Sequence, residues 1–238
     1  MTARELFQAG KLDDAVKVLG AELRDKPADA QRRTFLFELL CFAGDLERAE
    51  KHLHILADRE KDSQLGAMLY FAAVHAERLR REQFASGQLP AADAAPEVGC
   101  TLNGEAFESI VDAHPRIGAR LELYAAGAYL WIPFEHILYI EMEAPKRLRD
   151  LLWIPALVRT GPKFQDKELG EVLIPVLYPD SYAYPNDSVR LGRETHWKDV
   201  EGGEPIPVGQ KMFLVDGEEF PLLEVRKLEF AAPEAATA

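Results

Sequence analysis

Proline is distributed very unevenly along this chain of 238 residues. Only Pro27 falls within residues 1–87, and the other 14 prolines follow. Proline inside a helix removes a backbone donor, and its ring clashes with the preceding turn. The first third of the chain can therefore be helical throughout, whereas the rest cannot. Residues 88–99, which combine small side chains with two prolines, are the predicted linker between the two parts.

The helical part contains an internal match. Residues 9–15 (AGKLDDA) correspond to residues 43–49 (AGDLERA) at an offset of 34 residues. That offset is the period of tetratricopeptide repeats, in which each unit is a helix–turn–helix. We therefore predict tetratricopeptide-like repeats with Gly10 and Gly44 in the turns, and chance similarity between two helices is the alternative. Two and a half repeat units are only marginally stable on their own, so the helices are expected to pack against the second part of the chain.

Beyond residue 99, short apolar runs separated by turn residues indicate antiparallel strands. Arg120–Tyr124 and Tyr129–Pro133 flank an Ala-Ala-Gly turn and predict a hairpin. Lys211–Val215 and Pro221–Lys227 flank Asp216-Gly217, a strong hairpin signature. Further strands are predicted at His136–Met142, Leu151–Val158 and Glu171–Tyr178, and single helical turns at Lys146–Asp150 and Asn186–Leu191.

These patterns predict an α+β protein. Its helical-repeat domain spans residues 1–87, and an antiparallel β-rich domain spans residues 100–231. The second domain is expected to be a bent sheet or barrel-like, since many short strands and hairpins are typical of both. A disordered tail is predicted over residues 232–238.

The tripeptide Trp-Ile-Pro occurs twice, beginning at Trp131 and at Trp153. Proline removes a ladder donor, so each copy is expected at the end, edge or bulge of a strand. Apolar residues on both faces of Tyr129–Phe134 favour burial on both sides. We predict that both tryptophans belong to the core and that truncating either to alanine costs about 3–5 kcal/mol. An exposed aromatic recognition surface is the alternative.

The net charge of −12 is concentrated in the second part of the chain. Residues 1–87 hold 14 Lys and Arg against 15 Asp and Glu, and the remainder holds 14 against 25. This argues against nucleic acid as a partner, because phosphate neutralisation needs clustered basic residues. A basic or amphipathic protein partner is compatible with it. No run reaches the roughly 18 apolar residues of a membrane span, no signal peptide is evident, and two cysteines are too few for a disulfide framework. A cytoplasmic location is expected.

Motifs for catalysis or metal binding are absent from the sequence. There is no His-Glu-x-x-His, Cys-x-x-Cys, phosphate-binding glycine loop or Gly-x-Ser-x-Gly. Acidic residues and histidines meet at residues 112–116 and 193–197. A hydrolase or transferase using Asp112, His114, Arg116 and Arg193 is therefore an alternative, although turn and capping roles are favoured there. We predict no catalytic residue, cofactor or metal.

Five segments follow one another in the β-rich part: DAHPRIGARLELYAAGAYLWIPFEHI, APKRLRDLLWIPALV, GEVLIPVLYPDSY, NDSVRLGRETHW and GQKMFLVDGEEFPLLEVRKLEF. Together they cover most of residues 111–230. Their combination resembles the ImpE/TagJ (SciE-type) family of type VI secretion accessory proteins, and the helical repeats fit that family's N-terminal part. The chain departs from the family at His114 and His196, where an acid is usual. We interpret both positions as turns that tolerate substitution.

The resemblance implies a non-enzymatic cytoplasmic factor. Family members bind the small subunit of the contractile sheath through that subunit's N-terminal helix, with an indirect effect on recruitment of the AAA+ disassembly ATPase. A generic helical-repeat scaffold or chaperone without a secretion role is the alternative. Both the helical groove and the β-rich domain are candidate surfaces.

Six residues are candidates for partner binding. Arg147 and Arg149 lie in the charged run KRLRDLL, where a solvated turn with a local ion pair is the competing interpretation. Arg190 and Arg193 bracket Leu191-Gly192, where an interior structural role through bidentate bonds to acids is favoured. Trp131 and Trp153 complete the set.

Overall fold

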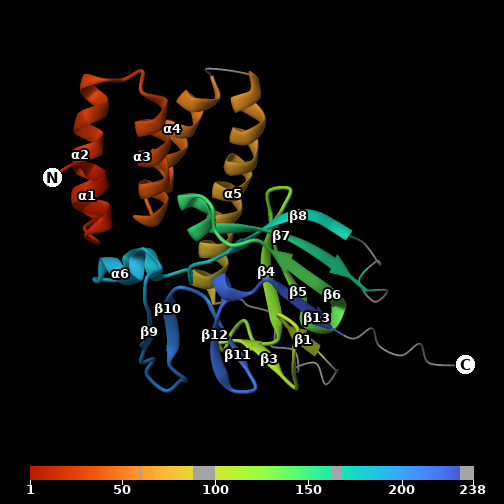
Figure 1. Ribbon diagram of the computed structural model, residues 1–238. Helices are drawn as coiled ribbons and strands as arrows, with labels where there is room; N and C mark the ends of the chain where they lie inside the picture. Colours follow the sequence, from red (N-terminus) through yellow and green to blue (C-terminus); the bar gives the residue numbers. More distant parts are fainter. Residues whose placement is uncertain (59–60, 88–99, 162–163, 165–167, 231–238) are drawn as a thin grey trace, which may run out of the picture.

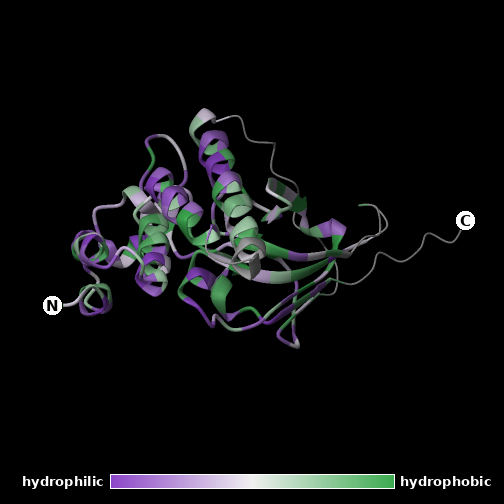
Figure 2. Cartoon of the chain, turned by 90° about the horizontal axis from the view of Figure 1, so that it is seen from above, coloured by the Kyte–Doolittle hydropathy of each residue, from purple (hydrophilic) through white to green (hydrophobic). Residues whose placement is uncertain are grey.

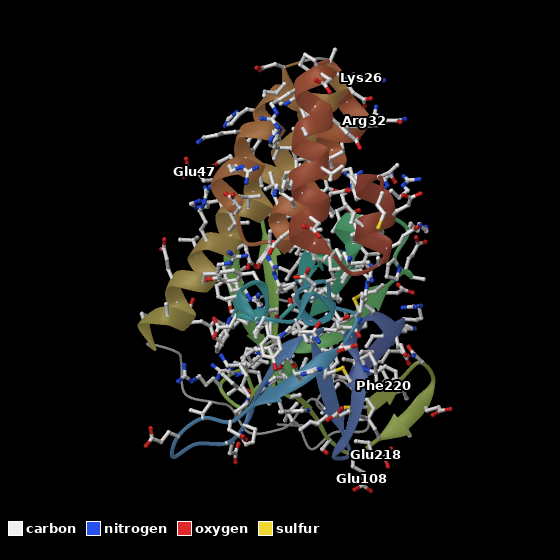
Figure 3. All side chains as sticks on the ribbon, turned by 90° about the vertical axis from the view of Figure 1, so that its left-hand side faces the viewer. Lys26, Arg32, Glu47, Glu108, Glu218 and Phe220 are labelled. Carbon is white, nitrogen blue, oxygen red and sulfur yellow. The ribbon has the colours of Figure 1, made fainter. Side chains whose placement is uncertain are left out.

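The computed structural model describes residues 1–58, 61–87, 100–161, 164 and 168–230. The predicted linker at residues 88–99 and the predicted tail at residues 232–238 lie outside this part. Helices occupy one end of the molecule and strands the other (Figure 1). Figure 3 marks these ends, with Lys26 and Arg32 at the helical end and Glu108 and Glu218 at the opposite end.

The N-terminal part of the described chain consists of helices. They are α1 (Ala3–Gln8), α2 (Leu12–Asp25), α3 (Ala30–Phe42), α4 (Leu46–Ala57) and α5 (Lys61–Ser86). Local signals set their starts: Thr2 and Glu5 form a capping box on α1, and Asp29 and Asp45 accept from the first turns of α3 and α4. Pro27 lies between α2 and α3, where it breaks no helix.

Gly10 and Gly44 occupy equivalent turns. Gly10 joins α1 to α2 with φ 71°, and Gly44 joins α3 to α4 with φ 79°. A left-handed backbone of this kind favours glycine, since a side chain would clash with its own carbonyl. Ala15 and Ala49, the small residues at the ends of the two matching segments, are both fully buried. The 34-residue offset thus relates two similar helical hairpins.

The strands form one large antiparallel sheet and two small ones. The large sheet has the order β2-β1-β13-β6-β7-β8-β4-β5. Its strands are β1 (Cys100–Leu102), β2 (Glu105–Phe107), β4 (Arg120–Ala125), β5 (Ala128–Pro133), β6 (Ile137–Met142), β7 (Trp153–Thr160), β8 (Glu168–Pro175) and β13 (Lys227–Phe230). The prediction of an α+β chain is confirmed. The barrel-like alternative is wrong, because β2 and β5 are the edges of an open sheet.

The small sheets hold the remaining strands of the described chain. One has the order β12-β11-β3 and the other pairs β10 with β9. These strands are β3 (Ile110–Asp112), β9 (Thr195–Lys198), β10 (Ile206–Gly209), β11 (Met212–Val215) and β12 (Glu218–Pro221). Single helical turns lie between strands: η1 (Phe134–His136), η2 (Leu148–Leu151), η4 (Ser181–Ala183), α6 (Asp187–Arg190) and η5 (Leu222–Glu224).

Both hairpin predictions identify the correct turn, but one places a strand wrongly. Ala126-Gly127 and Asp216-Gly217 have positive φ at both positions, as tight hairpin turns require. The predicted strand at Pro221–Lys227 is wrong. The two-residue turn starts β12 at Glu218, and its pairing with β11 ends where Pro221 faces Met212. The chain then forms η5, and Lys227 begins β13.

Two apolar cores meet at the large sheet. One lies on the helical side and combines residues of α1 to α5 with Tyr124, Trp153 and Leu173 of the sheet. The other lies between the large sheet and the β3–β11–β12 sheet, around Phe134 and Phe213. Figure 2 shows hydrophobic green along the central strands, whereas the helices beside them mix green with purple. The helices therefore pack against the sheet, as the sequence predicts.

Candidate functional site

A cluster of charged side chains is buried where α5 meets the large sheet. Arg80 of α5 donates from Nε and Nη2 to the two carboxylate oxygens of Glu122 in β4, at 2.8 and 3.0 Å. Lys211 donates to Glu122 at 2.6 Å and to Asp112 of β3 at 2.5 Å. All four side chains are almost completely buried. We call them the buried ionic network.

Tyrosine hydroxyls and a second carboxylate of α5 surround this network. Tyr124 donates to Glu77, Tyr129 to Glu122 and Tyr178 to Asp112, and Glu77 also accepts from Arg81 at 2.8 Å. A buried charge is tolerated only when it is paired and its hydrogen-bonding positions are filled. The network meets both conditions, since its two cations face two anions.

Burial and neighbouring charges set the protonation of the network. Burial alone would raise the pKa of Glu122, but Arg80 and Lys211 together outweigh this and hold it well below its usual range. At Asp112 burial dominates, so its pKa is raised despite Lys211, and Glu122 adds to the rise. Burial also raises the pKa of Tyr124 and Tyr178. Their hydroxyls therefore stay protonated and serve as donors.

The network was missed by sequence reasoning except for Asp112. Its members are far apart in the chain, with 42 residues between Arg80 and Glu122 and 89 between Glu122 and Lys211. One signal was present at Glu122, which interrupts the apolar run Leu121–Tyr124. In a strand that is buried on both faces, a single acid implies a buried cation opposite it.

The residues of the enzymatic alternative do not converge on a common pocket. Asp112 is paired with Lys211, His114 is buried beside it, Arg116 is exposed, and Arg193 donates to the main chain of α1. A cavity beside the network has a volume of about 20 Å³, roughly the size of one water molecule. None of the four candidate residues lines that cavity.

His114 is buried in the turn between β3 and β4. Burial, reinforced by Lys211, lowers the pKa of His114 to about 4. The ring is therefore neutral near pH 7, and its Nδ1 accepts from the Arg116 amide at 3.2 Å. An aspartate in an Asx turn accepts from the amide two residues ahead in the same way. The interpretation of His114 as a turn residue agrees with this contact. The same interpretation of His196 is wrong, because His196 lies in strand β9, where its Nε2 is 3.2 Å from Glu194.

Arg190 and Arg193 hold the α1–α2 turn against α6. Arg193 donates to the carbonyls of Phe7 and Gln8, at 2.6 and 3.1 Å, at the C-terminal end of α1. Arg190 donates to Asp13 at 2.9 and 3.0 Å. The carboxylate of Asp187 accepts from the Leu12 amide at 2.8 Å and so caps α2, whose N-cap Lys11 supplies no side-chain bond. Figure 1 shows α6 next to these helices. Both arginines make structural contacts, but only Arg190 bonds to acids as predicted. Arg193 is exposed rather than interior, and its partners are main-chain carbonyls.

The α3–α4 turn rests on Tyr182 of η4 in a similar manner. A Cβ added at Gly44 would lie 2.3 Å from the Tyr182 ring. Arg81 donates to the Gly44 carbonyl at 3.1 Å and stacks its guanidinium over Tyr182 at 4.0 Å. The two matching glycine turns are therefore both held by the segment between β8 and β9.

The two tryptophans have different environments. Trp153 is 3% exposed and packs in the helical-side core, with its ring centroid 6.5 Å from that of Tyr70. Trp131 is partly exposed, packs under the Arg120 guanidinium at 4.5 Å, and donates to Tyr129. Trp153 is thus a core residue as predicted, and Trp131 lies at the margin of the core.

Arg149 and Arg147 lie beside the N-terminal half of α5. Arg149 stacks over Tyr70 at 4.7 Å. Arg147 is exposed and lines a surface groove with a volume of about 760 Å³. Behind them, burial raises the pKa of Glu38 in α3 to about 7, although Arg149 and Arg147 oppose the rise. Among the described residues, no group of histidine, cysteine and acidic side chains could hold a metal ion, and no helix is long and apolar enough to cross a membrane.

Comparison with known proteins identifies the family of this chain. Residues 104–229 match the family model described as ImpE protein, which is more than half of the chain. The chain belongs to the ImpE family. The type VI secretion system accessory component TagJ of Pseudomonas aeruginosa is 32% identical to it, over 99% of this chain and 93% of TagJ. The crystal structure of protein VPA1032 from Vibrio parahaemolyticus has a TM-score of 0.84 at 24% identity, covering 98% of both chains. That likeness shows a shared fold.

The region that matches the ImpE family model contains most of the residues that form the contacts described above. Asp112, Glu122 and Lys211 of the buried network fall within the matched region, as do Asp187 and Arg193. In this ImpE protein, Glu122 ties α5 to the large sheet, and Asp187 and Arg193 tie α2 and α1 to the segment around α6.

Proposed function

We propose that this ImpE protein is a cytoplasmic accessory adaptor of a type VI secretion system. It binds the small subunit of the contractile sheath through that subunit's N-terminal helix. The similarity to TagJ, which extends over 99% of the chain, supports this role. Its effect on the AAA+ disassembly ATPase is indirect, through the sheath component that it holds.

Binding rather than catalysis is the function that the geometry supports best. The observation that carries this choice is that two of the candidate reactive groups, Asp112 and Arg193, are bonded to other groups of the protein. Asp112 is held by Lys211, and Arg193 by carbonyls of α1. A catalytic acid or base needs access to substrate, and these groups are committed to internal contacts.

The helical region contributes the architecture of an adaptor. The hairpins α1–α2 and α3–α4 are tetratricopeptide-like units, α5 extends the stack, and residues 1–87 and 100–231 are its two domains. Two units are too few to stand alone, which agrees with the contacts that tie α1, the α3–α4 turn and α5 to the β-rich part. Stacked helical hairpins and sheets both present surfaces to which an amphipathic helix can bind.

A pull-down with the full chain tests this function. The tagged chain is incubated with the purified sheath small subunit, and in parallel with the same subunit lacking its first helix. Retention of the intact subunit and loss of the truncated one is the expected result. Equal retention of both would contradict the proposed mode of binding.

A further inference from the structure

Strand β5 is a free edge of the large sheet, since it pairs with β4 and lies last in the strand order. The Phe134 amide donates to the Ala119 carbonyl at 3.0 Å just beyond the paired strands. Hydrogen-bonded pairs alternate along an antiparallel ladder, so the backbone N–H and C=O groups of Tyr129 and Trp131 point away from β4. Among the residues that the structure describes, these groups have no hydrogen-bond partner.

Pro133 limits which strand can be added at this edge. It is the next outward-facing residue of β5, and it has no N–H to donate. A symmetric antiparallel partner centred on Leu130 avoids this residue, because Tyr129 of each copy then faces Trp131 of the other. Each of these residues exchanges both of its backbone bonds across the edge. Centring the pair on Trp131 would instead set Tyr129 against Pro133 and lose a bond on each side of the axis.

Helix α5 runs along β5 in the same direction. At one end of the contact, Ala72 lies against the turn between β4 and β5. At the other end, Phe84 packs on Trp131 with ring centroids 5.9 Å apart. Leu79, near the middle of this stretch of α5, therefore lies close to the level of Leu130 in β5.

These two leucines are exposed on opposite faces of the sheet. Leu79 and Leu130 are each 38% exposed. Trp131 faces α5, so Leu130, its neighbour along the strand, points to the other face. Helix positions seven apart share a face, so Leu79 lies on the side of α5 on which Ala72 meets the hairpin. Helix α4 packs on the other flank of α5.

The spacing across the edge fits a second copy of the same chain. Tyr124 of β4 donates to Glu77, and Trp131 of β5 packs on Phe84, so α5 lies over this pair of strands. Neighbouring strands are about 4.8 Å apart, so a copy paired through β5 places its α5 two spacings away, at about 10 Å. Packed helices lie roughly 8–10 Å apart. A single added peptide strand would leave Leu79 uncovered, whereas a second copy brings its own helix to that level.

The charges on this flank of α5 are compatible with such a pair. An antiparallel arrangement of two α5 helices centred on Leu79 sets His75 opposite Gln83 and Ala76 opposite Glu82. These pairs bring no two like charges together, and the small side chain of Ala76 allows the helices to approach closely.

We propose that the chain forms a homodimer through β5 and α5. The two β5 strands join antiparallel about Leu130, so the two large sheets become continuous, and the two α5 helices pack antiparallel about Leu79. The same surface serves both copies, as twofold symmetry requires. Pairing also covers an edge to which other chains could otherwise attach. The dimer goes beyond the proposed function and does not depend on it.

Sedimentation velocity of the full chain across micromolar concentrations tests the dimer. Leu130→Lys and Leu79→Lys each place two like charges at the axis. Leu157→Lys on β7 and Leu69→Lys on α5 are the matched controls, because both leucines are 40% exposed and lie away from the axis. Melting temperatures of all variants are compared first, and all four substituted side chains are already exposed.

Wild type is expected to dimerise reversibly. Leu130→Lys and Leu79→Lys are each expected to weaken the dimer at least about tenfold, and the controls to stay within about twofold of wild type. Mixing Leu130→Lys with Leu130→Glu should restore a dimer, because opposite charges then face each other across the axis. A monomeric wild type, or equal weakening by the controls, would overturn the proposal.

Hydrogen exchange tests the backbone contact itself. In the dimer the amides of Tyr129 and Trp131 are protected, and this protection is lost on dilution or in Leu130→Lys. The amides of Leu130 and Ile132 bond to β4 in both states and serve as internal controls. Fast exchange of Tyr129 and Trp131 within a wild-type dimer would place the contact elsewhere. A monomer in which these two amides become protected only on addition of the sheath small subunit would identify that subunit as the occupant. Either result contradicts the proposal.

Discussion

Arg80 and Glu122 form a two-bonded ion pair inside the protein, with both side chains 1% exposed. The pair joins α5 to β4, and Lys211 extends it to β3. Removing one partner of a buried pair leaves the other charge uncompensated in a medium of low polarity. The pair therefore makes the position of α5 on the sheet depend on charge neutrality as well as on apolar packing.

Arg80→Met is expected to lower the free energy of unfolding by about 3–5 kcal/mol, since it leaves Glu122 with Lys211 alone. Urea denaturation measures the change. Arg48→Met is the matched control, because the Arg48–Asp45 pair is exposed and such pairs contribute about 1 kcal/mol or less. A loss at Arg80 no larger than at Arg48 would refute the structural role of the network.

Gly44→Ala is expected to cost about 2 kcal/mol or more. The new Cβ would lie 2.3 Å from the Tyr182 ring, and the backbone at φ 79° disfavours a side chain. Gly20→Ala is the control, because nothing lies within 4 Å of a Cβ there and alanine favours helix by up to about 1 kcal/mol. The two substitutions should thus move the melting temperature in opposite directions. A neutral Gly44→Ala would mean that the turn does not rest on Tyr182.

The two tryptophans should differ in their contribution to stability. Trp153→Ala is expected to cost about 3–5 kcal/mol, as truncation of a buried aromatic residue does. Trp131 is partly exposed, so Trp131→Ala should cost less, about 1–3 kcal/mol, from lost stacking under Arg120 and the lost bond to Tyr129. The structure thereby revises the equal costs expected from sequence. Chemical denaturation measures the loss in free energy of unfolding for both variants. Equal losses would favour the expectation from sequence.

Glu38 should make stability fall as the pH rises towards 8. Burial raises its pKa to about 7, although Arg149 and Arg147 oppose the rise. The folded protein therefore keeps a proton that the unfolded chain releases near pH 4.5, so the stability present at low pH is lost as pH rises through about 7. The loss amounts to up to about 3 kcal/mol. Glu38→Gln should remove this slope between pH 5 and 8, and parallel pH profiles for the two proteins would contradict the assignment.

Features with a local cause were predictable from the sequence. The prolines that follow residue 87 mark the end of the N-terminal helical region, Gly10 and Gly44 mark helical turns, and Asp216-Gly217 marks a hairpin. Each depends on the backbone preferences of one or two residues. The exact strands were less predictable where an apolar run has no period: Pro221–Lys227 contains a strand end, a helical turn and a strand start.

The contacts that assemble the molecule were not predictable in this way. Arg80 finds Glu122 across 42 residues and Asp187 caps α2 across 175, and no local pattern specifies such pairs. The surface groove that Arg147 lines is formed between α5 and the sheet, so it too depends on tertiary structure. Of the six candidate residues for partner binding, Arg147 lines the groove, whereas Trp153, Arg190 and Arg193 hold the fold together.

The central claim is that this chain binds a helix of a sheath component. Isothermal titration of the full chain with a synthetic peptide of the sheath small subunit's first helix tests it most directly. The account predicts saturable, one-to-one binding of the peptide to the folded chain. No binding of the peptide, with the folded chain intact, would contradict it.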